Sequence, residues 1–153
     1  MPADPVRSAL VARIQSVPGI GIVHAYERYE LKAEKLAALY SDADGRLFGW
    51  HVRRVALREV SQALGASIED TDWQITGYRQ VVDAEASELA FDALIDSLRA
   101  AFQSDESLGG TVATTVVEDR LGLQLDESGL FLFAGVVCHA AQLSLTTRRY
   151  LRP

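Results

Sequence analysis

The chain has 153 residues, of which 48% are hydrophobic and 24% are charged, and its formal net charge is −6. This length and composition are typical of a globular chain that buries a substantial core, so we expect residues 1–153 to form a single domain. The acidic balance argues against a nucleic-acid-binding protein that relies on bulk positive charge. A single cysteine, Cys138, excludes an intramolecular disulfide, and its apolar surroundings predict a small core residue.

Targeting and membrane segments are not expected from this sequence. The start, Met1-Pro2-Ala3-Asp4-Pro5, lacks a basic stretch followed by an apolar one, which predicts no secretion signal. The longest apolar run, residues 129–137, is shorter than the ~20 residues that a membrane helix needs and favours a buried strand. The single thiol is typical of a reducing compartment, or of one where no disulfide is needed.

The first helix is predicted at the start of the chain. Asp4 can cap free backbone N–H groups, and Pro5 has its φ angle preset for a first helical residue. Apolar residues recur at helical spacing as far as Pro18-Gly19, where the helix ends: Val6, Leu10, Ile14 and Val17. Residues 21–26 then favour a short strand, which we expect near the centre of the sheet.

An ambiguous segment comes next and is followed by a long strand. Residues 28–41 are rich in helix formers but lie between strand-like runs, so they predict a short helix or an ordered excursion. Residues 42–45 predict a turn. Residues 47–60 favour a strand whose apolar residues change phase at Arg53-Arg54. That change indicates a bulge, or a strand whose two ends face different partners.

The middle of the chain predicts a loop, a strand and an amphipathic helix. Gly65 and the acidic stretch 69–72 are expected to form the loop, and residues 73–82 the strand. Asp83 is expected to cap the helix. The helix carries an apolar stripe, which would pack on the sheet: Phe91, Leu94, Ile95, Leu98 and Phe102.

The rest of the chain predicts further strands. Leu108-Gly109-Gly110 stops the helix, and the β-branched run 111–118 favours a strand. Residues 119–122 and 126–129 are expected to be turns around a short piece. Residues 130–147 predict a final strand with a bend at Gly135 or at Ala140-Ala141. The residues expected on one side of that strand are Phe131, Phe133, Val137, Leu143 and Leu145.

The expected element order is α-β-β-β-α-β-β. Runs of strands with only two main helices predict an α+β fold. We expect a mostly antiparallel sheet of about four to five strands, with the two helices packed on one face.

Candidate catalytic and metal-binding groups are few. His24, His51 and His139 each lie on an expected strand, without a second ligand at metal-binding spacing. Cys138 is adjacent to His139, so on a strand the two side chains point to opposite faces. The sequence contains no dinucleotide, nucleotide-phosphate or serine-hydrolase motif. We therefore expect no catalytic residue, no cofactor and no metal.

Three stretches resemble the tail terminator (tail completion) proteins of long-tailed phages and prophages. They are Trp73-Gln74-Ile75-Thr76-Gly77-Tyr78 before the helix, Leu108-Gly109-Gly110 after it, and the closing His139-Ala140-Ala141-Gln142-Leu143-Ser144-Leu145-Thr146. Together with the element order, the resemblance covers most of the chain. It concerns architecture, because none of these stretches carries catalytic groups.

The resemblance implies a ring, most often a hexamer, that caps the growing tail tube and stops its polymerisation. It also implies a surface for the head connector and neck proteins, and no active site. DNA would pass through the lumen without specific binding, which suits a net acidic chain. The protein would then lie at the tail–head junction of the virion, after assembly in the host cytoplasm.

A ring needs one patch that meets a different patch on the next copy. The long strand 47–60 with its turn is our candidate for one such patch, because Trp and Arg are enriched at interfaces. Its candidate interface residues are Trp50, His51, Arg53, Arg54 and Arg58. On this hypothesis, Trp50→Ala and Arg54→Glu lower ring formation without unfolding the subunit.

Two other functions stay open. One is a different neck, head–tail joining or minor tail protein, since small α+β folds of this kind resemble one another. The other is a small ferredoxin-like enzyme or ligand-binding module, which needs a pocket with convergent polar groups. His24, His51 and Tyr78 are the first residues to test for that activity.

Overall fold

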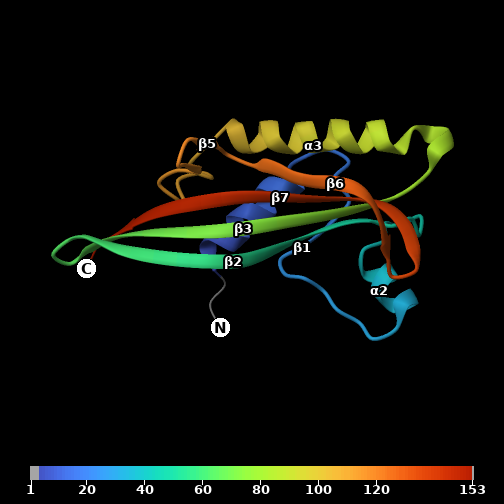
Figure 1. Cartoon of the computed structure of the whole chain (residues 1–153), viewed down its shortest axis with the longest axis horizontal. Helices are drawn as coiled ribbons and strands as arrows, with labels where there is room; N and C mark the ends of the chain where they lie inside the picture. Colours follow the sequence, from blue (N-terminus) through green and yellow to red (C-terminus); the bar gives the residue numbers. More distant parts are fainter. Residues whose placement is uncertain (1–3, 153) are drawn as a thin grey trace.

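The computed structural model describes residues 4–152, which form an α+β fold around a five-stranded mixed sheet (Figure 1). The helices are α1 (Pro5–Gln15), α2 (Ala33–Leu39) and α3 (Ser87–Gln103), and a 3-10 turn, η1 (Asp83–Glu85), precedes α3. The strands of the sheet are β1 (Ile22–His24), β2 (Phe48–Ala63), β3 (Ala66–Gln80), β6 (Gln124–Phe133) and β7 (Val136–Leu151). A separate hairpin consists of β4 (Val116–Val117) and β5 (Arg120–Leu121).

The strands lie in the order β1-β2-β3-β7-β6. β1 runs parallel to β2, and the other neighbouring pairs are antiparallel. None of the helices within residues 4–152 is long and apolar enough to cross a membrane. The expectation of no secretion signal concerns residues 1–5, of which residues 1–3 lie outside the described part of the chain.

α1 and α3 pack on the same face of the sheet and form the main core with it. Trp50 of β2 lies at the centre of that core and is fully buried. Its ring stacks on Phe91 of α3 at 5.8 Å, and its indole N–H donates to the carbonyl of Ile20 at 2.7 Å. Gly77 on β3 leaves the room for this ring, because a Cβ there would lie 2.3 Å from it. The large Trp and the small Gly therefore specify each other across the strand pair.

The opposite face, which we call the open face, is covered at one end by α2 and the residues beside it. Tyr40 directly follows α2 and is 1% exposed. Its ring packs edge-on against four others at 4.9–5.8 Å: His24, His51, Tyr78 and Phe133. α2 itself has no buried residue. Packing of Tyr40 therefore holds this segment on the sheet more than packing of the helix does.

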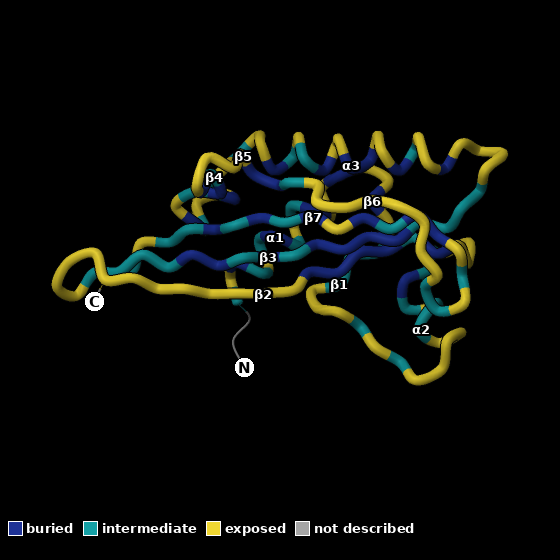
Figure 2. The backbone as a smooth tube through the Cα atoms, in the orientation of Figure 1, coloured by how far each residue is buried: buried dark blue, intermediate teal, exposed yellow. Residues whose placement is uncertain are grey.

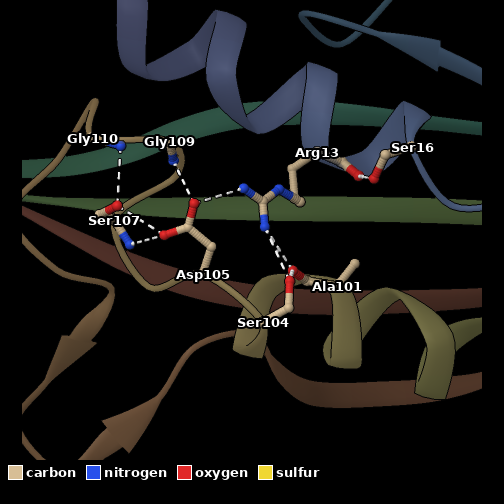
Figure 3. A network of polar contacts seen from close by, with 8 residues as sticks. All are labelled: Arg13, Ser16, Ala101, Ser104, Asp105, Ser107, Gly109 and Gly110. Atoms are coloured by element: carbon tan, nitrogen blue, oxygen red, sulfur yellow. Dashed lines mark hydrogen bonds and ion pairs between the residues drawn. The ribbon is translucent and has the colours of Figure 1, made fainter.

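The loop after α3 is tied to α1 by a network of hydrogen bonds (Figure 3). The Asp105 carboxylate accepts from the Ser107 hydroxyl at 2.8 Å and from the Gly109 N–H at 2.8 Å, and Arg13 of α1 lies 3.3 Å away. These donors, the Ser107 hydroxyl first, lower the pKa of Asp105 to about 2. Arg13 also donates to the carbonyl of Ala101 at 2.8 Å, so one side chain links the ends of two helices.

The first helix, the turn and the bulge agree with the sequence predictions. α1 begins at Pro5, and the Asp4 side chain accepts from the backbone N–H groups of Val6 and Arg7. Residues 28–41 do contain a short helix, α2. The pairing of β2 with β3 shifts register between Arg54 and Ala56, which places a bulge where the sequence changed phase. Cys138 is buried, as predicted.

Two predictions for the first half of the chain are wrong. β1 lies at the edge of the sheet and not near its centre. The acidic stretch 69–72 is part of β3 and not a loop, because arginines on the neighbouring strands neutralise it. Arg149 and Arg148 lie directly opposite Glu69 and Asp70. Charges that are paired across strands do not interrupt a sheet.

Asp83 was predicted to cap the second helix, and the structure places it in η1 instead. α3 begins four residues later at Ser87, after Ala86 in the left-handed conformation. The Ser87 hydroxyl accepts from the N–H of Val82, so the polar anchor of this junction is a residue that the sequence pattern did not single out.

The predicted strand 111–118 is a strand only at Val116–Val117. Leu108 and Val112 are buried in the core, so the chain there curves to fill a space and does not extend. The predicted turn 119–122 is partly replaced by β5, and residues 126–129 belong to β6. Local preference was outweighed by packing at both places.

The predicted final strand 130–147 is in fact two strands. The chain reverses at Ala134-Gly135, both with positive φ, in a two-residue hairpin between β6 and β7. The reversal puts Phe131 and Phe133 opposite Cys138 and Val136, so the two rings lie on the open face. They therefore do not share a side with Leu143 and Leu145, which face the helices.

Candidate interaction surface

The β2–β3 hairpin projects beyond the helices as an arm, which we define as residues 55–70 (Figure 1). From Arg53 to Gly65 every residue is exposed, as the continuous exposed stretch of β2 in Figure 2 shows. Large apolar side chains stand among them: Val55, Leu57, Val60 and Leu64 are 49%, 46%, 57% and 106% exposed. Such a concentration of apolar surface is typical of an interaction site.

Ion pairs across the strands hold the arm to β7. The Arg148 guanidinium donates two hydrogen bonds to Asp70, at 2.8 and 2.9 Å. Hydrogen bonding to Arg148 is the main cause that lowers the pKa of Asp70. Arg149 and Glu69 form a second pair at 2.7 Å on the other face of the strands. The base of the arm is therefore rigid although no helix covers it.

β6 is the edge strand on the far side of the sheet. Its apolar half is exposed, with Leu130 at 70%, Phe131 at 52% and Leu132 at 64%. Its other half contains Asp126 and Glu127 beside a bulge. Acidic groups and a bulge are common protections of an edge strand, but the apolar half has neither.

A shallow pocket of about 180 Å³ lies on the open face where β3, β7 and β6 run side by side. Among its lining residues are Tyr78, Gly129, Phe131 and Ala140. The pocket is mainly apolar, and Tyr78 and Glu127 are its titratable groups. This lining suits an apolar side chain of a packing partner better than a polar substrate.

The five candidate interface residues do not form one surface. Trp50 is 0% and His51 is 2% exposed, on opposite faces of β2, so neither can contact a neighbouring copy of this subunit. Arg53, Arg54 and Arg58 are exposed. The prediction was wrong for the first two residues because a strand of 16 residues is buried at one end and exposed at the other.

His24, His51 and Tyr78, the residues chosen for a possible enzymatic activity, do lie together around Tyr40. The Tyr40 hydroxyl accepts from the backbone N–H of Arg28 and lies 3.0 Å from Nδ1 of His51. Its proton is therefore free to donate to that nitrogen, which requires neutral histidine. Burial lowers the pKa of His51 to about 4. The hydrogen bonds of this cluster are mutual, which is typical of a structural network.

His139 is also buried, and its Nε2 lies 2.8 Å from the Ser87 hydroxyl. Within residues 4–152 no group of three or more His, Cys, Asp or Glu side chains could hold a metal ion. The histidines thus join elements of the fold: His24 contacts the carbonyl of Leu39 at 2.6 Å, and His139 contacts α3.

The sequence reasoning missed the apolar edge of β6 and the tip of the arm at Leu64. A signal for the first was available, since Ala134-Gly135 can form a two-residue reversal. Had residues 124–151 been interpreted as a hairpin, Leu130 and Leu132 would have been candidates for an exposed edge.

Comparison with known proteins does not assign this chain to a family. No protein-family model matches it, and no curated protein does either.

Proposed function

We propose that this protein is a structural component of a phage tail, a tail terminator. It would assemble into a ring, probably of six copies in the sense that the resemblance implies, that caps the tail tube and ends its polymerisation. The observation that carries the proposal is the projecting arm with its exposed apolar residues. In a ring, neighbouring copies cover such surface, which a lone subunit leaves in water.

The sequence resemblance supplies the partners in this proposal. They are further copies of the chain, the tail tube protein on one side of the ring, and the head connector or neck proteins on the other. The net charge of −6 supports a lumen through which DNA passes without being held.

The direct test is electron microscopy of the purified protein, alone and mixed with tail tubes. We expect rings, and density at the head-proximal end of the tubes. A ring at the other end, or binding along the side of the tube, would favour a different neck or minor tail protein.

A matched pair of variants tests the role of the arm. Leu57→Ser combined with Val60→Ser removes apolar surface from the arm, and we expect it to abolish capping while the thermal midpoint stays near that of the wild type. Leu89→Ser on α3, where the leucine is 68% exposed, is the control and should cap normally. Equal capping by both variants would contradict the proposal.

A further inference from the structure

Two edges of the sheet have no strand partner within residues 4–152. β6 forms one edge over its whole length. At the other edge, β1 pairs only with Gly49, Trp50 and His51 of β2. The Arg7 side chain donates to the carbonyl of Val52, the next residue along. From Arg53 to Ala63, β2 has β3 on one side and no strand on the other. Such backbone groups are a template for pairing with another chain.

The charges of these two edges are opposite. The only charged residues of β6 are Asp126 and Glu127. The free part of β2 contains Arg53, Arg54 and Arg58, with Glu59 as its one acid.

The charges that would meet are largely available. Arg54 has no ion pair or side-chain hydrogen bond within the described residues, and the same holds for the Asp126 and Glu127 carboxylates. Arg53 lies 3.7 Å from the half-exposed Glu27, a loose pair. Opposite charges on the two edges would steer copies together and disfavour contacts between two β6 edges.

The apolar content of the two edges also matches. Leu130 and Leu132 of β6 are 70% and 64% exposed, and Val55 and Leu57 of β2 are 49% and 46% exposed. Each edge thus combines a charged part with an apolar part. Pairing would remove both apolar parts from water without burying a charge that has no partner.

The strand directions fit an uninterrupted sheet. From β2 through β3 and β7 to β6 there are three antiparallel steps, so β2 and β6 run in opposite directions. If the next copy continues the sheet in the same orientation, its β2 lies antiparallel to β6. A contact between two different edges is heterologous and can repeat around a ring.

We propose that β6 of one copy pairs antiparallel with residues 53–63 of β2 in the next copy. This inference rests on the proposed ring and names its subunit contact. Because β1 occupies β2 at 49–51, the incoming strand pairs farther along β2. Neighbouring copies are therefore staggered along the strands, as in closed sheets whose strands are tilted. Asp126 and Glu127 then lie beside the arginines.

A charge swap tests this contact in the full chain. Arg54→Glu and Asp126→Arg each place like charges together, and we expect each to reduce the fraction of subunits in rings by about 10-fold or more. The variant with both substitutions restores opposite charges and should recover assembly. Asp92→Arg, on the exposed side of α3, changes the net charge as Asp126→Arg does and should assemble like the wild type.

Sedimentation and electron microscopy, with and without tail tubes, provide the readout, and circular dichroism shows that each variant is folded. Loss in both single variants with recovery in the double variant supports the proposal. Normal rings from both single variants would overturn this contact and leave the proposed ring intact. If the wild type forms no ring under either condition, the proposed function itself fails.

Discussion

The helix-covered face of the sheet and the arm differ in what stabilises them. On the covered face, Trp50, Trp73, Ile75 and Leu143 are at most 1% exposed and form one core with α1 and α3. On the arm, apolar side chains of the same kinds are about half exposed or more. The stability of the subunit is thus concentrated in one region, and the other region is free to pack against a partner.

The largest effect that this comparison predicts is at the centre of the core. Trp50→Ala should lower the free energy of unfolding by ~3–5 kcal/mol, because it leaves a cavity beneath Phe91 and an unpaired carbonyl at Ile20. Urea titration measures it. The earlier expectation that this substitution spares the fold is therefore replaced. A loss below about 1 kcal/mol would show that the core does not depend on Trp50.

Acid should act through the aromatic cluster on the open face. The folded state lowers the pKa of His51 from 6.5 to about 4, so the unfolded chain binds the proton more readily. Stability is complete above pH 6.5 and falls on the order of 2–3 kcal/mol as the pH drops towards 4. Thermal midpoints across this range provide the measurement. In His51→Gln, which does not titrate, this part of the slope should disappear; an unchanged slope would assign it to other groups.

The base of the arm should show a smaller effect. Asp70→Ala removes the acceptor of two hydrogen bonds from Arg148 and should cost ~1–3 kcal/mol. The pKa of Asp70 is lowered in the folded state, so its contribution is present above the unfolded value of 3.8 and is lost as the pH falls below it. Arg148→Ala should give a similar loss in chemical denaturation. Additive losses in the double variant would show that the pair is not coupled.

The smallest effect on folding is predicted at the tip of the arm. Leu64 is fully exposed, so Leu64→Ser should change the free energy of unfolding by less than about 0.5 kcal/mol. Denaturation of the unassembled subunit checks this. A loss comparable to that of Asp70→Ala would mean that the tip packs on the rest of the subunit, and the contrast between the two regions would be weaker.

The sequence was informative where a local pattern and the packing agree. Asp4 and Pro5 predicted the start of α1, and the stripe from Phe91 to Phe102 predicted the face of α3 that packs on the sheet. The phase change at Arg53-Arg54 predicted the bulge in β2. In each case neighbouring residues determine the outcome, so no distant contact was needed to foresee it.

Where distant residues decide, the sequence alone was not sufficient. The stretch 69–72 is a strand because Arg148 and Arg149, almost 80 positions away, pair with it. The burial of Trp50 depends on the absence of a side chain at Gly77. The candidate surface was likewise only partly foreseen: three arginines of β2 are exposed as expected, but the acidic and apolar edge of β6 follows from the hairpin reversal.

The central claim is that the free edges of β2 and β6 are covered when copies assemble. Hydrogen exchange, measured residue by residue on the unassembled subunit and on rings, tests it most directly. The account predicts that alternate backbone amides in residues 53–63 and 124–133 exchange about 10-fold or more slowly in the ring, while the outer side of α3 is unchanged. Rings in which both edges exchange as fast as in the free subunit would contradict it.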